Sequence, residues 1–299
     1  MQTNIKTVFQ TITAQLQTIY DKNEAESIAF LLIEFLYKNS RTDVLVAKEL
    51  INFDEKLLQS YINRLLKHEP IQYIIGKAFF YENDFIVNQH TLIPRSETEE
   101  LVHLIIQENK LRNHLKIIDI GTGTGCIPIT LFHNLTQADV YGIDIDKNTL
   151  EVAQENARNL SANITWINQD ILNTEIAWQS NFQVKFDMQP DMKFDIIVSN
   201  PPYVRELEKT AMQPNVLNYE PAKALFVSNE NPLIFYEAIA DFALKYLAKQ
   251  GKLYFEINQY LGQETKQMLE SKGFIEVEII KDLHENDRIC KAKNLLRVY

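Results

Sequence analysis

The sequence predicts an α/β fold, in which helices cover both faces of a largely parallel sheet, preceded by a small bundle of helices. From Lys116 onward, short apolar segments of strand type alternate with helical segments, which is the pattern of a parallel sheet. The last two strand segments have no helix between them, so we expect them to pair antiparallel. No glycine occurs before Gly76, and apolar residues there recur at helical spacing. The chain therefore divides into a helical N-terminal part and an α/β part.

Length and composition are those of an ordinary globular protein. The 299 residues suffice for one large or two ordinary domains, with 45% hydrophobic and 23% charged residues. A net charge of −10, without a block of basic residues, argues against binding nucleic acid through its phosphates. No apolar run reaches the roughly 18 residues of a membrane span, and no signal-peptide pattern is present. Cys126 and Cys290 have neither metal spacing nor a disulfide framework, so we expect a cytoplasmic protein without a metal.

Three apolar stripes of helical spacing predict the N-terminal bundle. They run through Ile5–Ile19, Ile28–Leu36 and Leu57–Leu66. Asp54 is placed as the N-cap of the third helix, and Pro70 ends it. The bundle contains no recognisable catalytic constellation, so we interpret it as a packing or recognition domain.

A change of pattern follows the bundle. Ala78–Tyr81 and Asp84–Val87 have the character of two short extended segments. A hairpin linker over residues 76–95 explains them.

The first helix of the α/β part follows this hairpin. Ser96 and Glu99 match a capping box, which predicts a helix running to about Asn109. That cap accounts for both residues. Arg95, just before it, is kept as a candidate site residue.

A glycine-rich turn comes next. The apolar run Lys116–Ile120 predicts a buried strand, and Cys126–Asn134 predicts a helix. Glycines at such a turn let backbone approach a ligand closely, and the helix N-terminus offers N–H groups. A dinucleotide fingerprint would have glycine or alanine at position 126, so Cys126 argues against a dehydrogenase. The turn consists of Gly121, Thr122, Gly123, Thr124 and Gly125.

The next two predicted strands both end close to carboxylates. Ala138–Asp144 ends in an acid about twenty residues beyond the glycine turn, where a carboxylate can accept both hydroxyls of a ribose. Asp146 is placed as the cap of the following helix. Ile164–Gln169 is followed by Asp170, which suits an adenine amino group or is a solvated loop residue.

A fourth strand ends in a motif of four residues. The apolar run Phe194–Ser199 stops at Asn200, and two prolines follow. Neither Pro201 nor Pro202 can donate to a sheet ladder, so the strand must end in a stiff extended turn. The turn brings an amide, a carbonyl and the aromatic ring of Tyr203 together, which suits a planar amino-bearing group. The alternative is a common turn followed by a core tyrosine.

Residues 172–193 carry few signals, although Phe182, Val184 and Phe186 alternate as in a surface hairpin. Residues 204–232 lack sustained periodicity, which predicts a binding loop or lid. The remaining segments alternate between helix and strand: helix Leu233–Leu247 ended by Gly251, strand Lys252–Ile257, helix Leu261–Glu270 ended by Gly273, strand Phe274–Ile280, polar loop Asp282–Lys291 and strand Lys293–Tyr299.

The candidate residues share one location in the predicted sheet. The glycine turn, Asp144, Asp170 and Asn200 all follow the carboxyl ends of strands, where open α/β sheets bind their ligands. This coincidence favours a functional interpretation of each.

The combined motifs resemble a known family. Asp119–Gly125, Asp144 and Asn200–Tyr203 are similar to those of class I S-adenosylmethionine-dependent methyltransferases that methylate amino groups. Within that class the chain resembles the HemK/PrmC family, which methylates the glutamine of the Gly-Gly-Gln motif in peptide-chain release factors. The resemblance covers about Lys67 to Tyr299. It extends to Glu69–Gly76, Leu92–Glu99, Tyr219–Pro221 and Asn286–Arg288. Two features depart from the family: Ser96 replaces a usual proline, and Leu172–Lys193 is longer.

The resemblance implies a seven-stranded, Rossmann-like sheet and three parts of the chain. These are a substrate-recognition bundle (1–75), the hairpin linker (76–95) and a methyltransferase domain (96–299). S-adenosylmethionine would be the cofactor and S-adenosylhomocysteine the product, with the methionine part of the cofactor in the glycine turn. Asp144 would bind the ribose, and Asp170 and Ile171 would flank adenine.

The resemblance also implies roles in substrate binding. The side-chain oxygen of Asn200 and the carbonyl of Pro201 would accept the two N–H groups of the substrate amide. Asn200 would also face the cofactor. Tyr203 would stack on the amide plane, and Pro202 and Arg95 would complete the substrate site.

The implied partners are release factors, bound by a monomer without membrane or direct nucleic-acid contact. A ribosomal-protein glutamine methyltransferase stays open as an alternative, although Leu92–Glu99 and Asn286–Arg288 favour the release-factor branch. A DNA adenine methyltransferase shares the four-residue motif, but the net charge of −10 disfavours it. A regulatory, non-enzymatic module would be expected to lose Asn200–Tyr203, which is intact.

Overall fold

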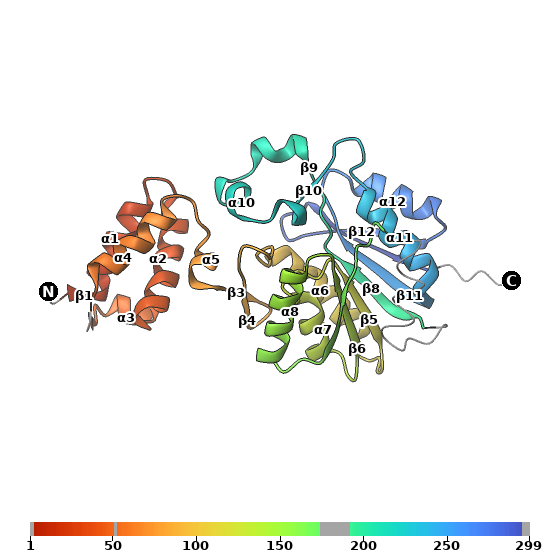
Figure 1. Ribbon diagram of the computed structural model, residues 1–299, viewed down its shortest axis with the longest axis horizontal. Coiled ribbons are helices and arrows are strands. Elements are labelled where there is room, and N and C mark those ends of the chain that lie inside the picture. The colour runs from red at the N-terminus through yellow and green to blue at the C-terminus, as the bar shows by residue number, and fades with distance from the viewer. Residues whose placement is uncertain (1–2, 51–52, 174–191, 295–299) are drawn as a thin grey trace. The chain divides into compact units, whose positions relative to one another are not determined.

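The computed structural model describes residues 3–50, 53–173 and 192–294, and the chain divides into two compact units (Figure 1). The first unit contains the chain up to Lys77 together with Met212–Tyr219, and the second contains the rest. The predicted hairpin of Phe182, Val184 and Phe186 lies outside the described residues. No helix of the described chain is long and apolar enough to cross a bilayer.

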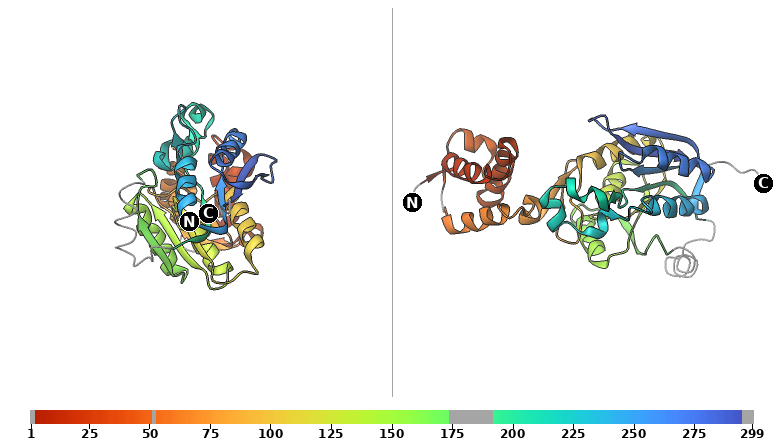
Figure 2. Two further views of the ribbon diagram at one scale, coloured as in Figure 1. Left: turned by 90° about the vertical axis from the view of Figure 1, so that its right-hand side faces the viewer. Right: turned by 90° about the horizontal axis from the view of Figure 1, so that it is seen from above.

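Helices that pack side by side make up most of the first unit (Figures 1 and 2). All three predicted apolar stripes form helices, around a core that includes Ile12, Leu32 and Ile62. Asp54 caps the third of them as predicted, because it accepts a hydrogen bond from the N–H of Leu57 at 3.0 Å. The elements are β1 (Thr3–Asn4), α1 (Ile5–Leu16), α2 (Lys22–Tyr37), α3 (Arg41–Leu45), β2 (Glu49–Leu50), α4 (Glu55–Leu65) and α5 (Ile71–Ile75).

The segment predicted to be a binding loop or lid contains short elements of its own. β9 (Val204–Arg205) pairs in parallel with β10 (Phe226–Val227). Between them, α10 (Pro214–Tyr219) belongs to the first unit, where the hydroxyl of Tyr219 donates to the carbonyl of Lys67 at 2.9 Å. Two short 3-10 helices complete the segment: η2 (Glu206–Ala211) and η3 (Ala222–Ala224).

The centre of the second unit is the predicted seven-stranded sheet, in the order β12-β13-β11-β8-β5-β6-β7. The inner strands pair in parallel, whereas β13 is antiparallel to both of its neighbours, as expected for the last two strands. A separate hairpin consists of β3 (Lys77–Phe80) and β4 (Asn83–Ile86). The sheet strands are β5 (Lys116–Ile120), β6 (Asp139–Asp144), β7 (Ile164–Asn168), β8 (Phe194–Ser199), β11 (Leu247–Glu256), β12 (Ile275–Lys281) and β13 (Asp287–Lys293).

Helices cover both faces of this sheet, and alternate residues of its strands enter two cores. Ile118 and Ile197 pack in the core that contains α11 and α12, whereas Ile117 and Ile196 pack in the core of α6, α7 and α8. The alternation follows from the two-residue period of a strand. The helices are α6 (Ser96–Asn109), α7 (Cys126–Asn134), α8 (Lys147–Asn159), α11 (Ile234–Tyr246) and α12 (Gly262–Ser271).

The predicted capping box at the start of α6 is wrong. The hydroxyl of Ser96 donates to the carboxylate of Glu97 at 2.9 Å, and no side chain caps the helix. Glu99 instead accepts a hydrogen bond from the N–H of Tyr81, also at 2.9 Å. Tyr81 lies in the turn of the β3–β4 hairpin, so a tertiary contact replaces the local cap.

Two predicted boundaries near the C-terminus are also wrong. α11 ends at Tyr246, one residue before the predicted last residue Leu247, but Gly251 does not terminate it, because β11 already begins at Leu247 and passes through the glycine with a shift in register. A Cβ at Gly251 would lie 2.9 Å from the side chain of Leu247. The last strand, Asp287–Lys293, occupies the second half of the segment predicted to be a polar loop. Residues 295–299, which were predicted to be strand, lie outside the described chain.

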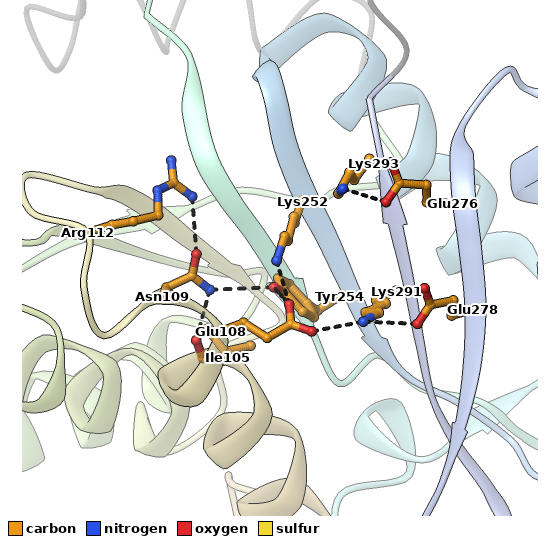
Figure 3. Close-up of polar contacts among 10 residues, drawn as sticks. All are labelled: Ile105, Glu108, Asn109, Arg112, Lys252, Tyr254, Glu276, Glu278, Lys291 and Lys293. Atoms are coloured by element: carbon orange, nitrogen blue, oxygen red, sulfur yellow. Dashed lines mark hydrogen bonds and ion pairs between the residues drawn. The ribbon is translucent and has the colours of Figure 1, made fainter.

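A cluster of charges holds the C-terminal end of α6 against the sheet (Figure 3). Glu108 accepts hydrogen bonds from the ammonium groups of Lys252 at 2.6 Å and Lys291 at 2.8 Å, and from the hydroxyl of Tyr254 at 2.7 Å. Lys291 also pairs with Glu278 at 3.0 Å. This cluster fixes the helix whose N-terminal end reaches the candidate site.

Candidate active site

A cavity of about 690 Å³ opens at the carboxyl ends of the central parallel strands. This volume is within the usual range for a small-molecule site. Its walls include eight of the predicted site residues: Gly121, Gly123, Asp144, Asp170, Ile171, Asn200, Pro201 and Pro202. Five others are outside the walls formed by described residues: Arg95, Thr122, Thr124, Gly125 and Tyr203.

The glycine turn requires glycine for two reasons. Gly121, Gly123 and Gly125 have φ of 77°, 55° and 79°, in the left-handed region that other residues rarely adopt. No atom of the described residues lies within 4 Å of a Cβ built at Gly121 or Gly123, so the backbone is open to a ligand there. At Gly125 a Cβ would lie 2.9 Å from the ring of Trp166. The third glycine is therefore required by packing as well as by its backbone conformation.

The two threonines of the turn hold its shape. The hydroxyl of Thr122 donates to Asp119 at 2.6 Å, and the carbonyl of Thr124 accepts from the side chain of Asn156 at 3.0 Å. Both threonines are buried. They hold the turn through these contacts, and their predicted binding of the cofactor stays a prediction.

Asp119 is a candidate site residue that the sequence analysis did not single out. Its side chain is fully buried, and Oδ1 has no hydrogen-bond partner among the described residues. Burial, with a smaller contribution from the charge of Asp144, raises its pKa to about 7. A cationic or N–H group bound beside Gly121 would satisfy this oxygen. The available signal was an acid within an otherwise apolar strand, one residue before its end at the glycine turn.

Asp144 and Asp170 are both held by backbone N–H groups. Asp144 accepts from Gly123 at 3.1 Å and from Asp146 at 3.0 Å, while burial raises its pKa. Asp170 accepts from Leu172 at 2.9 Å. Each carboxylate oxygen has more than one acceptor position, so both side chains can accept further hydrogen bonds from a ligand.

Asn200 is fixed by a hydroxyl group from α6. Its Nδ2 donates to Oγ1 of Thr98 at 3.1 Å, and Thr98 in turn donates to the carboxylate of Glu256 at 2.6 Å. Tyr203 reaches the same carboxylate, to which its hydroxyl donates at 2.9 Å. The backbone carbonyl of Tyr203 accepts from Asn258 at 3.0 Å. Thr98 and Glu256 were missed, because no sequence spacing relates residues 158 positions apart.

Arg95 lies outside the cavity walls in an ion pair. Its guanidinium contacts Glu220 at 2.5 Å, and the other oxygen of Glu220 accepts from the N–H of Ile93 at 3.1 Å. The pair ties the segment before α6 to the end of the long segment between β9 and β10. Arg95 therefore supports two walls of the cavity from outside.

A seven-stranded sheet with one antiparallel strand, and a glycine turn beside a cavity at the strand ends, defines a class I methyltransferase. Residues 111–288 match the family model of a methyltransferase domain, and residues 7–76 match that of the PrmC N-terminal domain. The chain belongs to the family of release factor glutamine methyltransferases.

Similar proteins extend over nearly the whole chain. The release factor glutamine methyltransferase of Flavobacterium psychrophilum is 44% identical, over 93% of this chain and 94% of the relative. That of Bacteroides thetaiotaomicron is 41% identical, over 94% and 97%. Among solved structures, a Thermus thermophilus 16S rRNA N2 G1207 methyltransferase with AdoMet and guanosine is 16% identical, with a TM-score of 0.49 over 73% of this chain and 50% of that one.

Proposed function

We propose that the protein transfers a methyl group from S-adenosylmethionine to the side-chain amide nitrogen of the glutamine in the Gly-Gly-Gln motif of release factors. One observation carries the proposal: a single cavity is lined both by the strand-end carboxylates Asp144 and Asp170 and by the turn of Asn200, Pro201 and Pro202. The relatives that share 41–44% identity with this chain have the corresponding name.

The cavity residues fit the proposed cofactor group by group. Asp119 is fully buried and is not among the described residues that line the cavity, but its unpartnered oxygen suits an ammonium group beside the glycine turn, where Gly121 and Gly123 leave open space. Asp144 would accept the ribose hydroxyls. Asp170 and Ile171 would contact the adenine. When bound, the cofactor supplies an electrophilic methyl group on a sulfonium centre.

The substrate amide nitrogen is a poor nucleophile, because its lone pair is delocalised into its carbonyl. The residues around Asn200 can compensate for this. Oδ1 of Asn200 and the carbonyl of Pro201 would accept the two N–H bonds and hold the nitrogen in place. Both oxygens would stabilise positive charge as it develops on that nitrogen. The side-chain amide of Asn200 is hydrogen-bonded to a hydroxyl rather than to a titratable base. We therefore assign proton loss to water, after transfer.

The other predicted substrate contacts remain part of the proposal. Pro202 would shape the wall beside the amide. Tyr203 would stack on the amide plane, with its ring orientation set by the hydrogen bond to Glu256. Arg95 would act through its ion pair with Glu220.

The helical N-terminal domain is proposed to grip the body of the release factor. The glutamine loop of the release factor must reach Asn200 at a defined angle, because positioning dominates reactions of this type. Because release factors act on ribosomes, the proposed activity would be cytoplasmic. The net charge of −10 speaks against direct nucleic-acid binding.

To test the proposal, the protein is incubated with radiolabelled S-adenosylmethionine and with purified release factor, ribosomal proteins or DNA. We expect label on the release factor, and loss of that label when its Gly-Gly-Gln glutamine is replaced by alanine. Label on a ribosomal protein or on DNA alone would reassign the substrate. Cofactor binding without label on any of them would support a regulatory module.

A further inference from the structure

Glu256, at the carboxyl end of β11, is a buried carboxylate whose role in the proposed function is so far limited to orienting the ring of Tyr203. It is 1% exposed, and each of its oxygens accepts a hydrogen bond from a hydroxyl group. Thr98 of α6 donates to Oε2 at 2.6 Å, and Tyr203 donates to Oε1 at 2.9 Å. Both partners touch or belong to the Asn200–Tyr203 turn. A buried charge is costly to maintain, so its contacts call for an explanation.

The number of available protons determines how Asn200 is oriented. A hydroxyl has one proton, and that of Thr98 is committed to Glu256. Oγ1 of Thr98 can therefore only accept from Asn200, which must present its Nδ2 group, as it does at 3.1 Å. Nδ2 and Oδ1 point in different directions from the same carbon. Oδ1 is thus left free for the cavity that Asn200 lines.

The ionised form of Glu256 is essential to this arrangement, because a protonated carboxyl would itself become a donor. It would then donate to Thr98 or to Tyr203. A Thr98 hydroxyl that accepts from Glu256 would have its proton free for Asn200, and the amide would be stable with Oδ1 turned away from the cavity. The chain of hydrogen bonds therefore transmits the charge state of Glu256 to Asn200.

The surroundings of Glu256 both raise and lower its pKa. Burial, the largest influence, raises its pKa, and the charge of Glu97 raises it further. The hydrogen bonds from Thr98 and Tyr203 and the positive charge of Arg288 lower it. Arg288 is held by Asp282, with Nε 3.1 Å from Oδ2. The guanidinium of Arg288 is thus the counter-charge supplied by the Asn286–Arg288 segment.

We propose that Glu256 is a positioning residue, which acts through Thr98 to orient the Asn200 amide with Oδ1 toward the substrate and through Tyr203 to hold the same turn. This inference rests on the proposed function, because it concerns the amide that would receive the substrate nitrogen. Neither Glu256 nor Thr98 needs to touch the cofactor or the reacting atoms.

The test compares three substitutions at the start of α6 in the full chain. Thr98→Val removes the hydroxyl at nearly constant shape, and Thr98→Ser keeps it. Ser96→Ala removes an exposed hydroxyl that, among the described residues, bonds only to Glu97. We expect T98V to lower kcat about tenfold to a hundredfold, with KM for release factor and the Kd for S-adenosylmethionine within about twofold of wild type. T98S should regain most of this loss, and S96A should leave kcat unchanged.

Glu256→Gln adds a readout that a purely structural role would not change. In the wild type, kcat should fall as the pH drops through the pKa of Glu256. In E256Q, kcat should be low throughout and should lack that acid limb. Thermal unfolding of each variant establishes that it is folded.

Two results would overturn the inference: a folded T98V that retains wild-type kcat, or an E256Q that keeps both the rate and the acid limb. Failure of the proposed function is distinguishable, because in that case the wild type itself puts no label on release factor.

Discussion

Helix α6 contacts strand β11 through a carboxylate near each of its ends, and the two carboxylates differ in nearly every respect. Near the C-terminal end, Glu108 is 20% exposed and is bound by two ammonium groups and a tyrosine hydroxyl (Figure 3). Near the N-terminal end, Glu256 is 1% exposed and is bound by two neutral hydroxyls. The contact at Glu108 attaches α6 to the sheet, whereas the contact at Glu256 lies beside the proposed reaction centre.

The pKa values of the two groups move in opposite directions. Burial alone would raise the pKa of Glu108, but hydrogen bonds from Lys252, Lys291 and Tyr254 outweigh it and lower the pKa to about 2. For Glu256 burial prevails, and the pKa is raised. The comparison teaches that a carboxylate stabilises this fold where cations meet it, and that a carboxylate without a directly bonded cation is retained for another purpose.

The largest expected effect lies at the functional end. Asn200→Ala removes one of the two acceptors proposed for the substrate amide, so methyl transfer should fall by at least about a hundredfold. The free energy of unfolding should change little, because within the described part of the chain the side chain makes one hydrogen bond, to Thr98. Single-turnover kinetics at saturating substrate measures the effect. Near-normal turnover would remove Asn200 from the proposed mechanism.

A pair of matched substitutions then separates the roles of the two carboxylates at the ends of α6. Glu108→Gln should lower the free energy of unfolding by about 1–2 kcal/mol, since it replaces charge-assisted hydrogen bonds with neutral ones, while kcat stays the same. Glu256→Gln should lower kcat without a comparable loss of stability, because it also removes a buried charge. Urea unfolding gives the free energy of unfolding of each variant, and the methylation assay gives its kcat. If both variants lost stability alone, the two carboxylates would have the same role.

These carboxylates also mark the limit of what the sequence predicts. The strands Lys116–Ile120 and Phe194–Ser199 were predicted with their bounds, because a buried parallel strand is a local apolar run that ends at turn residues. Their carboxyl ends bring the glycine turn and Asn200 to the same cavity. The strand order that brings Glu256 beside Thr98 is a property of the whole sheet, so local patterns could not reveal it.

The errors have the same origin. Glu99 has the spacing of a capping box, yet its carboxylate bonds to Tyr81 on a separate hairpin. Gly251 has the position of a helix C-cap, yet β11 pairs with β8 on both sides of it. In each case a long-range partner competes with a local signal and prevails.

The contributions of Glu108 and Glu256, at the two ends of α6, to the free energy of unfolding should change with pH in opposite directions. Glu108 has a pKa lowered from 4.5 to about 2, so it stabilises the fold above pH 4.5, and this contribution is lost as the pH falls toward 2. The stability difference between wild type and E108Q should therefore shrink over that window. Glu256, whose pKa is raised, opposes folding once it is ionised, so its contribution declines as the pH rises. Urea unfolding at several pH values checks both directions, and a wild type–E108Q difference that grows on acidification would contradict the first.

The smallest expected effects distinguish the two lysines that bind Glu108. Lys252 contacts only Glu108 among the ion pairs of the described chain, whereas Lys291 lies between Glu108 and Glu278 (Figure 3). Replacement by methionine keeps most of the apolar stem of either side chain and removes its charge.

Lys252→Met should therefore cost about 0.5 kcal/mol of stability, and Lys291→Met about 1 kcal/mol, because the second variant leaves two carboxylates facing each other without their shared cation. Both losses should become smaller in 1 M salt, where exposed charges are screened. Thermal unfolding at low and high salt measures them. Should Lys252→Met prove the more harmful, the stability of this contact would come from a single short pair rather than from the bridged cluster, and the attachment of α6 to the sheet would depend on β11 alone.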